Sequence, residues 1–130
     1  KMQKYERIVV PKGACCPVCG MLVGKNPNWA TMIKTDKEEF YFDGVKDMMK
    51  YYFEKGGQFE QIYVSDYYKL TKIDAKSAFY VSGSNVFGPM GNELIPFASE
   101  EDAKTFAKDH GGKQIVKFDE ITTLLVERLM

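Results

Sequence analysis

Hydrophobic and polar positions in the first half of the chain predict short strands around one amphipathic helix. Residues 30–34, 38–43 and 61–65 are rich in β-branched and aromatic side chains with stretches of alternation, which is typical of strands. Residues 44–55 instead place apolar side chains at helical spacing, and two glycines end that run. Asp43 stands where a carboxylate could cap the start of this helix.

The second half of the chain shows a similar pattern. Residues 93–97 are strand-like, Ser99 opens a capping signal for a helix, and Gly111-Gly112 ends that helix. The remaining strand-like segments in this half are residues 70–73, 78–82 and 114–118.

Corresponding elements of the two halves are separated by about 55 residues, which predicts an internal repeat. Each copy contains two strands, a helix and a further strand. We therefore predict an α+β fold of two tandem strand-strand-helix-strand units, residues 1–67 and 68–130, with a C-terminal helix at about residues 120–129.

Composition narrows the class of protein. The 130 residues are 45% hydrophobic and carry zero formal net charge, so the chain can bury one core or two small fused ones. The balanced charge argues against a basic face for nucleic acid or an anionic membrane, and favours a metal, small-molecule or protein partner. Residues 1–7 lack the apolar core of a signal peptide, so any signal or lipid-attachment cysteine would lie upstream.

A cysteine-rich run at residues 15–21 carries the most informative chemistry. It reads Cys-Cys-Pro-Val-Cys-Gly-Met and holds all three cysteines of the chain. Thiolate and thioether sulfur together favour Cu(I), whereas a closed all-cysteine zinc site needs four thiolates and is excluded within one chain. Gly20 between Cys19 and Met21 permits an unusual backbone angle that can turn both sulfurs towards one point.

Alternatives remain for the other cysteines. Cys16 could be a second thiolate ligand, or could form a disulfide with Cys19 in a thiol redox protein, although this pair does not sit in a βαβ unit. A zinc-stabilised interaction module would use Cys16, Cys19 and His110 with a fourth ligand from elsewhere. Cys15 is expected to point away from Cys16 and to be a bystander.

Two residues outside the run are further candidates for metal ligands. Met90 lies between Pro89 and Gly91, in a loop whose sequence has no periodicity to explain a core methionine. His110, the one histidine of the chain, stands at the end of a predicted helix. There it could be a copper ligand or gate, or simply a cation that interacts with the last carbonyls of the helix.

An ordered set of motifs resembles the NosL family, the copper-binding accessory proteins of nitrous oxide reductase assembly. The matching segments are Cys19-Gly20-Met21, the helix start near Asp43, Tyr80-Val81 followed by Gly83-Ser84, Gly88-Pro89-Met90-Gly91, and Pro96-Phe97-Ala98 leading to His110-Gly111-Gly112. The resemblance spans roughly residues 16–120, and this chain adds Cys15 and Cys16 to the Cys-Gly-Met common in the family. It implies a fold related to the treble clef and to part of organomercurial lyase.

The resemblance also implies a function. We expect a Cu(I) chaperone and not an enzyme, with Cys19, Met21, Cys16, Met90 and His110 as candidate ligands and zinc as the alternative metal. The expected partner is a copper-receiving client such as nitrous oxide reductase or its assembly machinery. The expected location is periplasmic or otherwise outside the cytoplasm, with a lipid anchor as the sole membrane contact.

Overall fold

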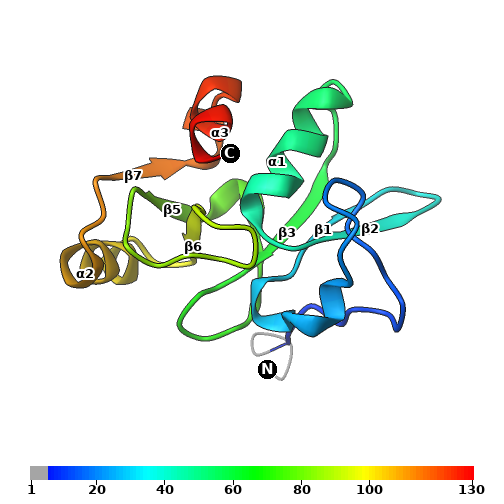
Figure 1. Cartoon of the computed structure of the whole chain (residues 1–130), viewed down its shortest axis with the longest axis horizontal. Helices are drawn as coiled ribbons and strands as arrows, with labels where there is room; N and C mark the ends of the chain where they lie inside the picture. The colour runs from blue at the N-terminus through cyan, green and yellow to red at the C-terminus, as the bar shows by residue number, and fades with distance from the viewer. Residues whose placement is uncertain (1–5) are drawn as a thin grey trace.

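The short alternating segments of the first half pair into an antiparallel sheet in the computed structural model, which describes residues 6–130 (Figure 1). The strand order is β2-β1-β3-β4. Its strands are β1 (Thr31–Lys34), β2 (Glu39–Phe42), β3 (Gln61–Ser65) and β4 (Lys72–Asp74). Pairing Thr31 with Phe42 and Ile33 with Ile62 sets a register that buries apolar side chains in the core.

The second half forms a separate three-stranded antiparallel sheet with the order β6-β5-β7. Its strands are β5 (Phe79–Ser82), β6 (Ile95–Phe97) and β7 (Gln114–Lys117). Pro96 is compatible with β6 because this strand lies at an edge of the sheet, where a missing N–H costs no ladder hydrogen bond.

Three α-helices accompany the sheets: α1 (Val45–Glu54), α2 (Glu100–His110) and α3 (Thr123–Leu129). Ser99 caps α2 by accepting a hydrogen bond from the Asp102 N–H at 3.2 Å, as the sequence predicted. Gly111 ends α2 with a φ of 69°, a left-handed angle that favours glycine. Short 3-10 turns occur at Val23–Lys25, Pro27–Trp29, Ala75–Ser77 and Phe118–Glu120.

The predicted α+β class and the repeated order of strands around a helix are confirmed, since β2-β1-β3 and β6-β5-β7 correspond. Three details are wrong. Residues 72–74 pair with β3 and so belong to the first sheet. The last helix begins at Thr123 because a 3-10 turn precedes it, and Asp43 does not cap α1. The division at residue 67 and the treble-clef relationship stay predictions.

Hydrophobic packing joins the two halves. A small cluster places α2 against the second sheet; its buried members are Val81, Ile95, Phe97, Ala103 and Phe106. The larger cluster takes residues from both sheets, because Phe42, Ile62 and Met48 share it with Tyr80 and Val116. The two faces of the second sheet therefore pack into different hydrophobic cores. One face packs against α2, and the other belongs to the core that it shares with the first half.

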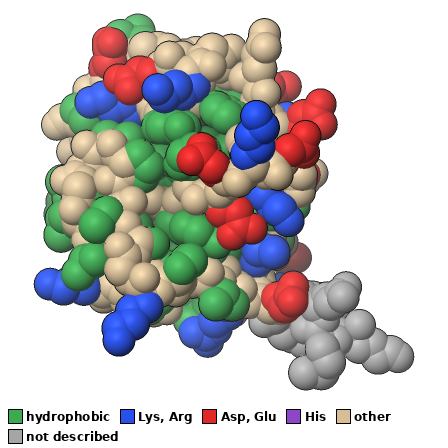
Figure 2. Space-filling view, turned by 90° about the vertical axis from the view of Figure 1, so that its right-hand side faces the viewer, with side chains coloured by type: hydrophobic (Ala, Val, Ile, Leu, Met, Phe, Trp, Pro, Cys, Tyr) green, Lys and Arg blue, Asp and Glu red, His purple; other side chains and the backbone are tan. Residues whose placement is uncertain are grey.

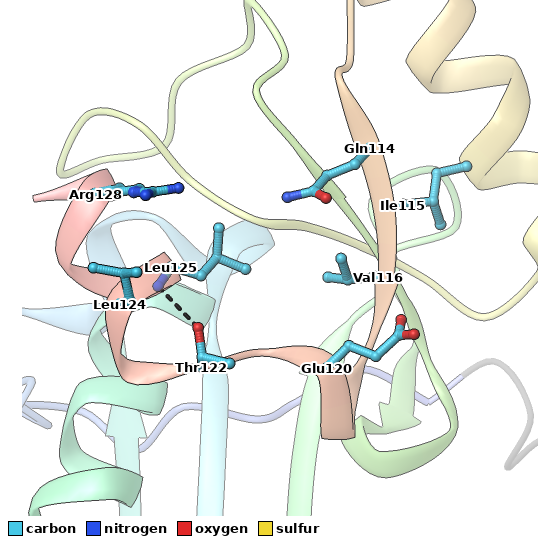
Figure 3. A pocket seen from close by; sticks show the side chains of 8 residues that line it. All are labelled: Gln114, Ile115, Val116, Glu120, Thr122, Leu124, Leu125 and Arg128. Atoms are coloured by element: carbon cyan, nitrogen blue, oxygen red, sulfur yellow. Dashed lines mark hydrogen bonds between the residues drawn. The ribbon is translucent and has the colours of Figure 1, made fainter.

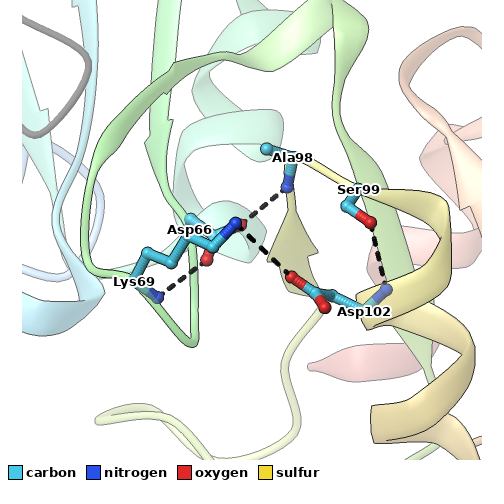
Figure 4. A network of polar contacts seen from close by, with 5 residues as sticks. All are labelled: Asp66, Lys69, Ala98, Ser99 and Asp102. Carbon is cyan, nitrogen blue, oxygen red and sulfur yellow. Dashed lines mark hydrogen bonds and ion pairs between the residues drawn. The ribbon is translucent and has the colours of Figure 1, made fainter. Parts of the chain in front are cut away.

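Polar contacts reinforce the junction between the halves. The buried Asp66, just after β3, accepts hydrogen bonds from the N–H groups of Ala98 at 2.7 Å and Lys69 at 2.8 Å (Figure 4). Lys69 also approaches Asp102 of α2 at 4.0 Å.

Within residues 6–130, no helix has both the length and the apolar character that crossing a bilayer requires.

Candidate metal centre

The cysteine-rich run folds into a tight loop whose ends pair. Cys15 and Leu22 form an antiparallel bridge, the Cys16 N–H donates to the Met21 carbonyl at 2.9 Å, and the Gly20 N–H donates to the Cys16 carbonyl at 2.8 Å. Gly20 adopts a φ of 81°, which an L side chain rarely tolerates. The loop thereby fixes the positions from which Cys16 and Cys19 reach the protein core.

The two thiols meet carboxylates at the start of α1. Cys16 Sγ donates to Asp47 Oδ2 at 3.6 Å, and Cys19 Sγ donates to Asp43 Oδ2 at 3.4 Å. One potential ligand atom from each of Cys16, Cys19 and Asp47 lies within 4.8 Å of the others. These three residues could hold a metal ion, and Asp43 adjoins them through Cys19.

Burial raises the pKa values of two residues of this cluster, Cys19 and Asp43. Burial chiefly, with hydrogen bonds to Cys16 and Asp43, raises the pKa of the Cys19 thiol well above its usual range, against a lowering contribution from the Met21 backbone. Burial, followed by the charge of Asp47, also raises the pKa of Asp43, although the bond from Cys19 lowers it in part. Protons therefore occupy sites that a thiophilic cation could take over.

One oxygen of this cluster lacks a partner. Asp43 Oδ1 is buried and accepts no hydrogen bond within the described part of the chain. Buried carboxyl oxygens are normally paired with donors or cations, so an unpaired oxygen on the residue that contacts the Cys19 thiol fits a place where a cation binds.

The predicted ligands fall into two groups. Cys16 and Cys19 come together as required for a shared ion. Met21 follows them in the same loop with its side chain 39% exposed, and Met90, also 39% exposed, lies in a loop that contacts α1 through Lys46. Cys15 is exposed and its thiol approaches the carbonyl of Gly13, as expected of a bystander.

His110 lies elsewhere. It is the last residue of α2, and its ring stacks against Phe106 with centroids 4.5 Å apart. Figure 1 shows α2 at the opposite side of the molecule from the blue thiol loop and α1. Figure 2, which views the side of the molecule on which β2 and α1 lie, shows exposed hydrophobic side chains among charges of both signs and no histidine. The described chain thus does not bring His110 to the thiol pair.

Sequence reasoning missed the two carboxylates. Asp43 is predicted only as a helix cap, and no pattern in the sequence singles out Asp47. Asp43 precedes the N-cap of α1 and Asp47 lies in its first turn, so only the folded loop of Cys16 and Cys19 brings the two carboxylates together with the thiols.

Comparison with known proteins decides the family. A model of the family described as NosL matches residues 7–126. The chain belongs to the NosL family. Among NosL proteins, the copper-binding lipoprotein NosL of Stutzerimonas stutzeri is 30% identical over 135 residues, which cover 96% of this chain and 70% of that protein.

Solved NosL structures share the fold. The copper chaperone NosL from Shewanella denitrificans matches with a TM-score of 0.79 at 26% identity, covering 92% of this chain and 98% of that one. The solution structure of apo-NosL from Achromobacter cycloclastes matches with a TM-score of 0.54 at 28% identity, covering 74% and 87%. The resemblance found in the sequence motifs is confirmed.

Proposed function

We propose that this chain binds Cu(I) at Cys16 and Cys19 and delivers it to a client metalloprotein. The observation that carries the proposal is the convergence of two thiols within 4.8 Å of each other and of Asp47, in a chain whose relatives are named copper-binding proteins. Soft thiolate sulfur favours Cu(I) over hard cations, and thioether sulfur can complete such a site. Met21 and Met90 are the available thioethers on exposed loops.

Charge supports a monovalent ion. Two thiolates and one Cu(I) carry a net charge of −1, which disfavours an ionised carboxylate beside them. A neighbouring carboxyl is therefore more compatible with the loaded site when it is protonated. The raised pKa of Asp43, caused by burial and then by Asp47, favours that protonated form. Asp43 would then keep its proton while the two thiols release theirs as the metal binds.

Release requires an accessible side. Cys16 is buried, but Cys19 is half-buried and Met21 is exposed, so an incoming ligand can approach the ion from the loop surface. Transfer would proceed by ligand exchange without free Cu(I). We propose nitrous oxide reductase or its assembly machinery as the client, and a lipid-anchored location outside the cytoplasm, since a relative is named a lipoprotein.

The test is an anaerobic titration of fully reduced protein with Cu(I) against a competing chelator, with Zn(II) run in parallel. The proposal requires stoichiometric Cu(I) binding that is much tighter than Zn(II) binding. Affinity should weaken as pH falls, because protons compete for the thiolates. Weak Cu(I) binding at neutral pH would contradict the proposal.

A zinc site is the second candidate, because one observation favours it. Asp47 supplies an oxygen ligand beside Cys16 and Cys19, and Zn(II) accepts mixed sulfur and carboxylate ligands. Tight Zn(II) binding, with loss of folding on chelation, would support a structural role. A thiol redox function has less support, because reactive thiols have lowered pKa values whereas burial raises that of Cys19.

A further inference from the structure

The first helix takes its cap from the other half of the molecule. The N-cap residue Gly44 has no side chain to offer, and the Lys46 N–H instead donates to Glu93 Oε2 at 2.7 Å. The same oxygen accepts from the Leu94 N–H at 3.0 Å, and Glu93 is only 3% exposed. A Cβ on Gly44 would collide with Glu93 Oε1, so glycine is needed for this approach.

The lysine at this junction reaches a second segment of the other half. Lys46 is buried, and its Nζ donates to the carbonyls of Met90 at 2.7 Å and Leu129 at 3.2 Å. The Met90 loop closes on itself through hydrogen bonds between Gly88 and Gly91 in both directions, at 2.8 and 3.1 Å. In Figure 1 the yellow loop before β6 runs to the start of α1.

These contacts adjoin the metal site directly. Lys46 precedes Asp47, which lies beside Cys16, in the first turn of α1. Burial is the main cause that raises the pKa of Glu93 to about 8, although its hydrogen bonds with the Leu94 and Lys46 N–H groups and the charge of Lys46 lower it in part. A chain of contacts thus runs from the thiols through the first turn of α1 to the loop that carries Met90.

We propose that Lys46 and Glu93 are positioning residues of the metal site, which hold the Met90 loop of the second half against the first turn of α1 and so place the Met90 thioether at the rim of the thiol pair. This inference rests on the proposed Cu(I) function and adds a role for the second half. It also assigns a purpose to the buried ammonium group of Lys46.

A purely structural role explains the pair less well. Burying an ammonium group costs free energy even when it is hydrogen-bonded, and apolar residues of similar volume often stabilise a core equally or better. An apolar side chain at position 46 could fill the same space. An apolar side chain could not donate a hydrogen bond to the Met90 carbonyl. Because hydrogen bonds are directional, that bond orients the loop in addition to packing against it.

The test is a double-mutant cycle between Lys46→Met and Met90→Leu, read out as Cu(I) affinity in an anaerobic chelator competition. If Lys46 acts by placing Met90, each single change should weaken Cu(I) binding by about 10-fold, and the double variant should be no weaker than the poorer single one. A merely structural lysine would weaken binding through the thiols as well, and the two losses would then multiply.

Lys50→Met is the matched control, because Lys50 lies one turn further along α1 and is half-buried; it should bind Cu(I) like the unaltered protein. The inference is overturned if folded Lys46→Met keeps its full affinity, or if the losses multiply. If the unaltered protein does not bind Cu(I), the proposed function itself fails first.

A second measurement needs no variant, in case Lys46→Met does not fold. Amide hydrogen exchange of the unaltered protein should slow on Cu(I) loading both in residues 44–48 and in residues 88–94, because the contacts join these segments. Protection confined to the thiol loop and α1 would overturn the inference.

Discussion

Helices α1 and α2 occupy corresponding places in the repeat but begin in different ways. α2 is capped locally by Ser99 and carries three acidic residues in its first turn, of which two are exposed and one is half-buried. α1 begins at a glycine and accepts its cap from Glu93, which lies 47 residues after Lys46. Because a distant residue does the capping, Asp43 and Asp47 are free to face the thiols.

The difference extends to the surroundings of each helix. α2 packs on an aromatic cluster that includes Phe97, Phe106 and Tyr67. A groove of about 370 Å³ between β7 and α3, seen in Figure 3, is lined in that half by residues such as Gln114, Leu125 and Arg128, and it holds none of the candidate ligands. Over residues 6–130, the potential ligand cluster occurs at α1. The first half thus holds the proposed metal ligands, and the second half supplies the cap of α1.

The largest effect on Cu(I) binding is expected from removing one of the two thiols that face the start of α1. Cys19→Ser should abolish stoichiometric Cu(I) binding, because a hydroxyl is a poor ligand for a soft ion. Chelator competition measures this directly. Cys15→Ser is the matched control, since its exposed thiol lies outside the cluster, and it should bind normally. Unchanged affinity in Cys19→Ser would remove Cys19 from the ligand set.

The two caps should differ in their contribution to stability. Glu93→Ala leaves the buried N–H groups of Lys46 and Leu94 without an acceptor and should lower the free energy of unfolding by roughly 3 kcal/mol. Ser99→Ala removes a local, partly exposed cap and should cost about 1 kcal/mol. Urea denaturation of both variants compares them, and equal losses would show that the cap of α1 is no more demanding than that of α2.

The cap that Glu93 provides to α1 should also make the free energy of unfolding depend on pH. Burial is the main cause that raises the pKa of Glu93 from 4.5 to about 8, so the folded state holds this proton more tightly than the unfolded state. Its stabilising contribution is complete below pH 4.5 and is lost as pH rises through 8, by about 1.4 kcal/mol per pH unit between these limits. Unfolding measured from pH 5 to pH 9 should show this slope relative to Glu93→Gln, which cannot titrate. Parallel curves would contradict it.

The smallest expected effects separate two predicted ligands. Met21→Ala should weaken Cu(I) binding without unfolding the protein, because the residue is partly exposed and lies in the same loop as Cys19, two positions further along the chain. His110→Ala should leave the affinity unchanged, because the ring stacks on Phe106 at the end of α2. Both are measured by the same competition. A marked loss in His110→Ala would show that the histidine reaches the ion in another conformation or from a second copy of the chain.

Local signals explain what the sequence could predict. Alternation gave the strands of both sheets, Ser99 and Gly111 marked both ends of α2, and the Cys-Pro-Val-Cys-Gly-Met run located the thiols. The carboxylates and the cap were hidden because they depend on tertiary contacts. Nothing near Gly44 in the sequence shows that Glu93 will approach it, and the strand at residues 72–74 has no local feature that assigns it to the first sheet.

The distance along the chain between Lys46 and its cap has a consequence for biosynthesis. All three cysteines leave the ribosome or a translocation channel well before Glu93 does. Until then the first turn of α1 lacks its acceptor, and the carboxylates that face the thiols are not held in place. If the proposed copper site is correct, its ligands would therefore be fully positioned only after the segment around Glu93 has been made and has folded against α1.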